Sequence, residues 1–207
     1  IPIEKILDDC LIAWAMNGEA LRPEQGYPVR LVVPGWEGNM WVKWIRRLEF
    51  GDKPYMTREE TSKYTDLLTD GKARMFTWVM EAKSVVTSPS PEKPILHKGI
   101  QQLRGLAWSG KGKIKRVDVS LDGGKNWRTA QLHAPIMTKS LVRFTLPFEW
   151  RGEELLIQSR AMDETGYVQP YIQDLQKIRG KNSIYHNNSI ATWLVSKSGK
   201  VDNVRLG

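Results

Sequence analysis

The sequence is poor in the residues that build disulfides and metal clusters. Its 207 residues include one cysteine, Cys10, and three histidines. A single cysteine excludes an internal disulfide framework, a four-cysteine iron–sulfur site and a covalent haem attachment motif. The histidines stand at positions 97, 133 and 186, so no two of them have a metal-ligand spacing. We therefore expect no metal ligand within this chain and interpret Cys10 as a small hydrophobic core residue.

Several other features are missing. No apolar run reaches roughly 18 residues, which excludes a membrane-spanning helix. No Walker loop, dinucleotide fingerprint or G-x-S-x-G element is present, so nucleotide-binding and serine-hydrolase functions have no support. The chain opens Ile1-Pro2-Ile3 without Met or the features of a signal peptide. We therefore expect it to be processed or to be part of a longer chain.

What is present is an ordinary globular composition with an uneven charge. The chain is 41% hydrophobic and 26% charged, and its length suits one or two domains. Residues 1–80 hold 11 Lys and Arg against 12 Asp and Glu, whereas residues 81–207 hold 20 against 11. Such a basic half can serve an acidic protein partner or an anionic ligand, or be a solvated surface. No recognition helix or aromatic-rich basic stretch accompanies it, so we expect no nucleic-acid binding.

The hydrophobic pattern divides the chain near residue 80. Residues 4–16 are compatible with a short helix that runs into a strand, and residues 27–33 and 42–50 are typical of strands. Residues 54–74 have no sustained period, which predicts a long irregular segment, either functional or a linker. From residue 81 onward, short strands are predicted at 84–87, 100–108, 113–121, 127–132, 142–146 and 155–161. Strands at this spacing, without helices between them, favour an antiparallel sandwich.

Two local patterns carry further predictions. Ser120, Asp122, Gly124 and Trp127 fit S-x-D-x-G-x-x-W, which we interpret as a structural hairpin whose aspartate caps the turn. Arg30 stands inside the apolar stretch 29–33, where a guanidinium has to be paired. Its partner is either a carboxylate or an anion such as phosphate, which suits the bidentate guanidinium fork.

A set of short stretches, in collinear order over nearly the whole chain, resembles one enzyme family. In residues 1–80 these stretches are Asn17-Gly18, Gly26-Tyr27-Pro28-Val29-Arg30, Val33-Pro34-Gly35 and Val42-Lys43-Trp44. In residues 81–207 they are Ser120 to Trp127, Arg160-Ala161-Met162-Asp163 and Val168-Gln169-Pro170. They resemble the sulfite oxidase family of molybdopterin enzymes. Residues 61–66, 80–84 and 164–167 are most similar to its SoxC-type sulfane dehydrogenases of bacterial thiosulfate oxidation.

The resemblance implies a mixed fold and two domains. Residues 1–80 correspond to the C-terminal remnant of an α+β molybdopterin-binding domain, and residues 81–207 to an immunoglobulin-like antiparallel β-sandwich that forms the dimerisation domain. The cysteine that binds molybdenum in this family stands far upstream of the Asn17-Gly18 turn, and Cys10 does not match it. The isolated chain is therefore expected to be inactive.

The resemblance also assigns residues, position by position. Arg30 matches the arginine that binds the pterin phosphate, in agreement with the anion alternative above. Gln25 stands where animal sulfite oxidases have a pterin-contacting histidine. Tyr64 matches the active-site tyrosine, and Arg179 matches an arginine of the anionic substrate pocket. The remaining cofactor-binding positions are Trp41, Val42 and Lys43.

The implied activity is oxidation of a sulfur substrate by oxo transfer at a molybdenum-molybdopterin cofactor. The substrate is protein-bound sulfane sulfur, presented by a sulfur-carrier protein, and electrons pass to a c-type cytochrome in the periplasm. The protein is expected to be a homodimer through residues 81–207. Two alternatives stay open: a sulfite dehydrogenase that shares every motif named here, and a non-catalytic dimerisation module.

Overall fold

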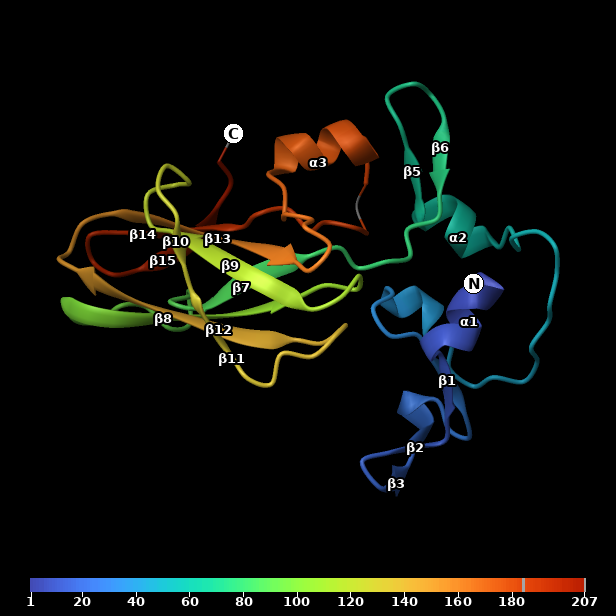
Figure 1. Ribbon diagram of the computed structural model, residues 1–207. Helices are drawn as coiled ribbons and strands as arrows, with labels where there is room; N and C mark the ends of the chain where they lie inside the picture. The colour runs from blue at the N-terminus through green and yellow to red at the C-terminus, as the bar shows by residue number, and fades with distance from the viewer. Residues whose placement is uncertain (184, 207) are drawn as a thin grey trace.

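The larger part of the molecule is a sandwich of two antiparallel sheets (Figure 1). The computed structural model describes residues 1–183 and 185–206. The five-stranded sheet has the order β10 (Arg128–Thr129), β9 (Ile114–Ser120), β13 (Leu155–Asp163), β14 (Thr192–Val195), β15 (Val201–Val204). The four-stranded sheet has the order β11 (Gln131–His133), β12 (Val142–Trp150), β8 (Gly99–Trp108), β7 (Lys83–Ser88). The predicted β-sandwich is thus confirmed.

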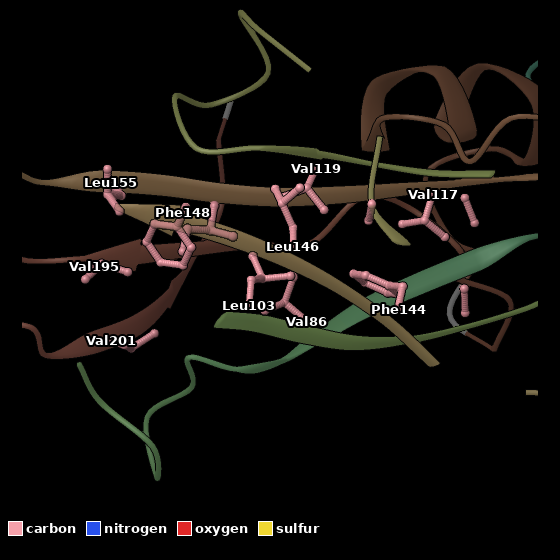
Figure 2. Packing of buried hydrophobic residues seen from close by; sticks show 14 of the residues in the cluster. Val86, Leu103, Val117, Val119, Phe144, Leu146, Phe148, Leu155, Val195 and Val201 are labelled. Carbon is pink, nitrogen blue, oxygen red and sulfur yellow. The ribbon is translucent and has the colours of Figure 1, made fainter. Parts of the chain in front are cut away.

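The sandwich core forms because its strands alternate buried and exposed side chains. In β12, Val142, Phe144, Leu146, Phe148 and Trp150 are buried while the residues between them face outward or are half-buried. Successive side chains of a strand point to opposite faces of the sheet, so such alternation gives each sheet one apolar face. Figure 2 shows these faces meeting, with side chains from both sheets filling the space between them.

Residues 1–80 form a smaller part with little regular structure. Its elements are α1 (Ile3–Asp9), β1 (Leu11–Ala13), β2 (Ala15–Met16), β3 (Glu19–Ala20), β4 (Arg30–Val32), α2 (Arg58–Lys63), β5 (Thr65–Leu67), β6 (Ala73–Met75) and the 3₁₀ turns η1 (Pro23–Gln25) and η2 (Gly38–Met40). Strand β1 pairs with β4, and β5 pairs with β6. The buried cluster of this part is small and centres on Leu31, Val33 and Trp36. It fits the expected part of a molybdopterin-binding domain beside a β-sandwich.

The structure differs from several local predictions. Residues 42–50 form no strand: Leu31 N donates to Val42 O and Ile45 N to Val29 O, but Trp44 has a φ of 54° that interrupts an extended run. The segment 54–74 is less irregular than predicted, since it holds α2 and the β5–β6 hairpin. These elements have three to six residues each, too few to show a period. Helix α3 (Ile172–Arg179) and strands β14 and β15 were not predicted.

The S-x-D-x-G-x-x-W motif forms the predicted hairpin between β9 and β10. Asp122 Oδ1 accepts hydrogen bonds from the backbone amides of Lys125 and Asn126, at 3.0 and 2.9 Å. Trp127 donates its indole N–H to Gly124 O, and the Arg160 guanidinium lies 4.1 Å from the centroid of its ring. The motif therefore organises a turn at the end of the five-stranded sheet, as predicted.

The two parts meet through closely approaching backbone. Met80 N donates to Gly35 O at 3.0 Å, and Gly110 N donates to Met80 O at 2.6 Å. Beside them, residues 36 and 79 form an isolated antiparallel bridge, and the rings of Trp36 and Trp78 stack with centroids 4.9 Å apart. These contacts hold the turn that follows β4 against the start of the sandwich, where the candidate site lies.

Candidate functional site

The predicted cofactor-binding residues gather around the guanidinium of Arg30. Its Nη1 donates to Gln25 O at 3.0 Å, and its Nη2 donates to Trp41 O at 3.2 Å. The guanidinium also lies 5.7 Å from the centroid of the Trp41 ring. Its Nε is buried and has no hydrogen-bond partner among the described residues. The side chain is thus fixed by two carbonyl oxygens, and its buried Nε–H is left without an acceptor among the described residues.

Lys43 brings a second cation to the same segment. Its ammonium donates to Glu24 O at 2.8 Å and lies 4.7 Å from the centroid of the Trp44 ring. Gly26 makes the approach possible, because a Cβ at that position would stand 2.9 Å from Lys43 Cβ and 3.1 Å from Arg30 Cβ. Val42 is next to Lys43 in the chain. All five predicted cofactor-binding residues therefore lie in residues 25–43, around Arg30 and Lys43.

The two cations have no acidic partner here. Among the described residues, no carboxylate lies within 4.0 Å of the nitrogens of Arg30 or Lys43. Carbonyl oxygens leave the positive charge of both side chains uncompensated, and a planar guanidinium beside a lysine suits phosphate. The structure therefore favours the anion alternative for Arg30 over the carboxylate alternative.

A second site is a depression of about 400 Å³ where residues 1–80 meet the sandwich. Tyr64, the residue that follows α2, lines it, and its ring lies 5.1 Å from that of Tyr185. We call this depression the Tyr64 pocket. Its lining residues are Glu37, Gly38, Asn39, Tyr64, Met80, Glu81, Lys83, Trp108, Tyr185, His186, Asn187 and Asn188.

The Tyr64 hydroxyl is kept protonated. Burial, together with the neighbouring Tyr185 and Glu37, raises the pKa of Tyr64 above its ordinary value of 10.0. At neutral pH the hydroxyl is therefore protonated, and it can donate a hydrogen bond within the pocket that Tyr64 lines. Because Thr77 N donates to Tyr64 O at 2.8 Å, the backbone of this residue is anchored to the segment that enters the sandwich.

Glu81, in the wall of the Tyr64 pocket, is the centre of a charge network. Its Oε2 lies 3.4 Å from Arg179 Nη2 and accepts the Tyr167 hydroxyl at 3.1 Å, while its Oε1 lies 3.3 Å from Lys111 Nζ. Burial raises the pKa of Glu81, but His186, Arg179 and Lys111 outweigh burial and hold it well below 4.5. Glu81 is therefore ionised and shared by several donors.

His186 links the two parts through the same network. Its Nδ1 lies 2.6 Å from Glu37 Oε1, and its Nε2 lies 3.4 Å from Glu81 Oε2. Burial lowers the pKa of His186, but the contacts with Glu37 and Glu81 outweigh burial and raise it above 6.5. The imidazole is thus positioned to carry a proton between two carboxylates, one from each part of the molecule.

The structure places Arg179 behind the pocket wall. The residue ends α3, its side chain is 3% exposed, and its Nη1 lies 3.0 Å from Asp66 Oδ2 in β5. Its Nη2 lies near Glu81, so both ends of the guanidinium face carboxylates. Arg179 does not line the pocket itself; it contacts Glu81, which does. Whether Arg179 contacts substrate stays a prediction.

Sequence reasoning missed the acidic and histidine members of this network. Glu37, Asp66, Glu81 and His186 come from four separated segments, and no spacing in the sequence connects them. The available signal was weak: Glu37 lies between two glycine turns, and His186 precedes a pair of asparagines.

Cys10 is half-buried beside the Trp36 cluster. Among the described residues, no three His, Cys, Asp or Glu side chains are grouped as metal ligands.

Comparison with known proteins identifies the family. The sequence profile described as oxidoreductase molybdopterin binding domain matches residues 1–59, and that described as Mo-co oxidoreductase dimerisation domain matches residues 74–193. Chicken (Gallus gallus) sulfite oxidase is 35% identical over 176 residues, which cover 78% of this chain. The chain belongs to the sulfite oxidase family. A nitrate reductase of Mycosarcoma maydis is 33% identical over 62% of the chain.

A solved structure of a family member matches the whole chain. The crystal structure of the sulfane dehydrogenase SoxCD from Paracoccus pantotrophus is 62% identical, with a TM-score of 0.95 over 100% of this chain. The present chain covers 54% of that structure's chain and 38% of the chicken sulfite oxidase. The present chain therefore spans about half the length of the SoxCD chain and less than half that of chicken sulfite oxidase.

The residues present fit the phosphate end of the family's molybdenum-molybdopterin cofactor. Within residues 1–183 and 185–206, Arg30 offers a buried, unpartnered Nε and Lys43 an ammonium without an acidic partner, and Gly26 keeps the two side chains close. These are the features that a bound phosphate needs. In this sulfite oxidase family chain, Arg30 and Lys43 would hold that end of the cofactor.

None of the helices in residues 1–183 and 185–206 is both long and apolar enough to cross a membrane.

Proposed function

We propose that this chain is part of a molybdopterin oxidoreductase that oxidises protein-bound sulfane sulfur and passes the electrons to a c-type cytochrome in the periplasm. The observation that carries the proposal is its 62% identity, over the whole chain, to the sulfane dehydrogenase SoxCD. The identity to chicken sulfite oxidase is 35% over 78% of the chain. This difference supports a sulfane rather than a sulfite substrate.

In this proposal the cofactor is anchored by residues 25–43. When bound, the molybdenum centre supplies the oxo group and takes up the electrons that leave sulfur. Arg30 and Lys43 bind the cofactor phosphate, because their charges have no acidic partner among the described residues. Gln25 contributes an amide, and Trp41 and Val42 contribute main-chain groups. A fixed cofactor orientation is the main contribution of this segment.

The Tyr64 pocket receives the sulfur group. The protonated hydroxyl of Tyr64 donates a hydrogen bond that orients the substrate. Arg179 is the proposed substrate arginine, held by Asp66 and Glu81 at the back of the pocket. Both charged side chains of the Arg179–Asp66 pair, from α3 and β5, are buried.

Dimerisation is proposed for residues 81–207. The matching profile is that of a dimerisation domain, and it lies over the sandwich. Within the sandwich, strands such as β8 leave large apolar side chains exposed; Ile100 is 84% exposed. Exposed apolar surface of this kind suits burial against a second copy.

The test compares two substrates with the complete enzyme that contains this chain, using a c-type cytochrome as acceptor. We expect kcat/KM for a carrier protein bearing a sulfane sulfur to exceed that for free sulfite by about tenfold or more. Tyr64→Phe should lower kcat/KM for the carrier by roughly 10- to 100-fold. Tyr55→Phe, at an exposed tyrosine outside the pocket, is the matched control and should retain activity.

The alternatives predict different results. A higher kcat/KM for sulfite than for the carrier supports the sulfite dehydrogenase alternative. Absence of both molybdenum and turnover in the complete protein supports a dimerisation module. Equal rates for the wild type and Tyr64→Phe would remove Tyr64 from the mechanism.

A further inference from the structure

Lys83 stands where two depressions adjoin. It is the first residue of β7 and pairs with Trp108, the last residue of β8. It lines the Tyr64 pocket and also a groove of about 560 Å³ that runs beside the start of α3. Asn187 lines both as well. Lys83 and Asn187 are therefore shared by the two depressions.

The ammonium of Lys83 has no acidic partner. It donates to the backbone oxygen of Asn187, and no carboxylate of the described residues lies within 4.0 Å of it. The side chain is half-buried, and burial lowers the pKa of Lys83. Removing an ammonium from water without a counter-charge is unfavourable, so an anion at this position would be stabilised.

The other cations near the pocket are already neutralised. Arg179 faces Asp66 and Glu81, and Lys111 lies 3.3 Å from Glu81. His186 lies between Glu37 and Glu81. Of the basic side chains that line the Tyr64 pocket in the described part of the chain, Lys83 is the one without a carboxylate contact.

We propose that Lys83 binds the anionic sulfur group of the substrate in the Tyr64 pocket. This inference rests on the proposed function and adds a binding residue to it. The ammonium supplies a positive charge for a sulfur oxyanion or a terminal sulfur anion, and the Tyr64 hydroxyl supplies a hydrogen bond from the same pocket wall. Lys83 acts on substrate binding, so its loss raises KM more than it lowers kcat.

The test uses the complete holoenzyme and three variants. Lys83→Gln keeps a donor for the Asn187 carbonyl but removes the charge, whereas Lys83→Arg keeps the charge. Lys197→Gln is the matched control, because Lys197 is exposed in the turn next to Gly199, whose neighbours are Ile95 and Trp150 at the far end of the sandwich. Steady-state kinetics give KM and kcat. Calorimetric titration with sulfate gives the Kd of a simple anion probe.

We expect Lys83→Gln to raise both KM and the sulfate Kd by about tenfold, with kcat changed by less than about threefold. Lys83→Arg and Lys197→Gln should stay within about threefold of the wild type in all three quantities. An unchanged KM and sulfate Kd in Lys83→Gln overturns the inference, even if kcat falls. If the wild type oxidises neither sulfur substrate but Lys83→Gln still weakens sulfate binding, the proposed function fails and the Lys83 site stands.

Discussion

His186 is the residue through which proton binding and stability are coupled in this molecule. Three charged groups face it: Glu37 from the turn before η2, Glu81 from the segment before β7, and Arg179 from the end of α3. The two carboxylates outweigh both the burial of the ring and the repulsion by Arg179, so the folded protein holds a proton on His186 more tightly than the unfolded chain does. A group whose pKa is raised on folding stabilises the fold most when it is protonated.

The first prediction follows from the rise of the His186 pKa on folding. The contribution of His186 is fully present below pH 6.5, its ordinary pKa, and is lost as the pH rises through the higher pKa of the folded state. We expect the free energy of unfolding to fall in this interval by at most about 1.4 kcal/mol per pH unit. Thermal unfolding at pH 6, 7 and 8 measures this effect through Tm.

His186→Gln should remove most of this pH dependence. The control is His133→Gln, which removes an exposed imidazole that contacts Thr145 on the sandwich. It should leave the pH dependence of Tm intact. The same decline of Tm with pH in His186→Gln and the wild type would contradict the prediction.

At the scale of elements, the backbone contact between Gly35 and Gly110 couples the two parts. A Cβ on Gly110 would stand 1.9 Å from Gly35 O and 2.8 Å from Met80 O, both of them backbone atoms. Since these atoms belong to the hydrogen bonds that join residues 35, 80 and 110, a methyl group can be accommodated only by separating them.

The second prediction is that Gly110→Ala destabilises the protein by about 2 kcal/mol or more. Urea or thermal unfolding measures the change, and limited proteolysis within residues 46–57 reports opening of the smaller part. Gly38→Ala is the control, because a Cβ there meets nothing within 4 Å and the residue has no positive φ. Equal stability of the two variants would show that this contact is not needed.

The elements also show what could be predicted from the sequence. Strands β8 and β12 have ten and nine residues and alternate buried with more exposed side chains, so their pattern identifies them. Strands β9 and β13, with seven and nine residues, alternate less regularly but are long enough to be recognised as apolar runs. Helix α2 has six residues, and the strands β5 and β6 have three each, so neighbouring contacts rather than a period decide their structure.

The same reason limits prediction of the site. Tyr64 and Arg179 were found through a family resemblance that assigns each position separately. Glu81 and His186 act through contacts between segments 105 positions apart. Such contacts depend on how the smaller part packs against the sandwich. Because long-range ion pairs produce no periodic pattern in the sequence, they could not be predicted from it.

At the scale of the whole molecule, charge is divided between the two parts. Residues 1–80 are close to neutral, whereas residues 81–207 hold 20 Lys and Arg against 11 Asp and Glu. Lys113 and Lys115 are exposed at and beside the start of β9, and neither side chain has an ion-pair partner among the described residues. A basic surface of this kind attracts an acidic protein over distances of about a Debye length, roughly 8–10 Å at physiological salt.

The third prediction concerns the proposed electron transfer from the complete enzyme, tested with a c-type cytochrome that has an acidic surface. If the basic half steers this encounter, the second-order rate of cytochrome reduction should fall by roughly tenfold as salt rises from about 50 to 500 mM. Reversing charge with Lys113→Glu and Lys115→Glu together should lower the low-salt rate and flatten its dependence on salt. Lys53→Glu makes one such reversal in the nearly neutral part and should have a much smaller effect. A rate that does not respond to salt would mean that these charges are only a solvated surface, because attraction between exposed charges is always screened.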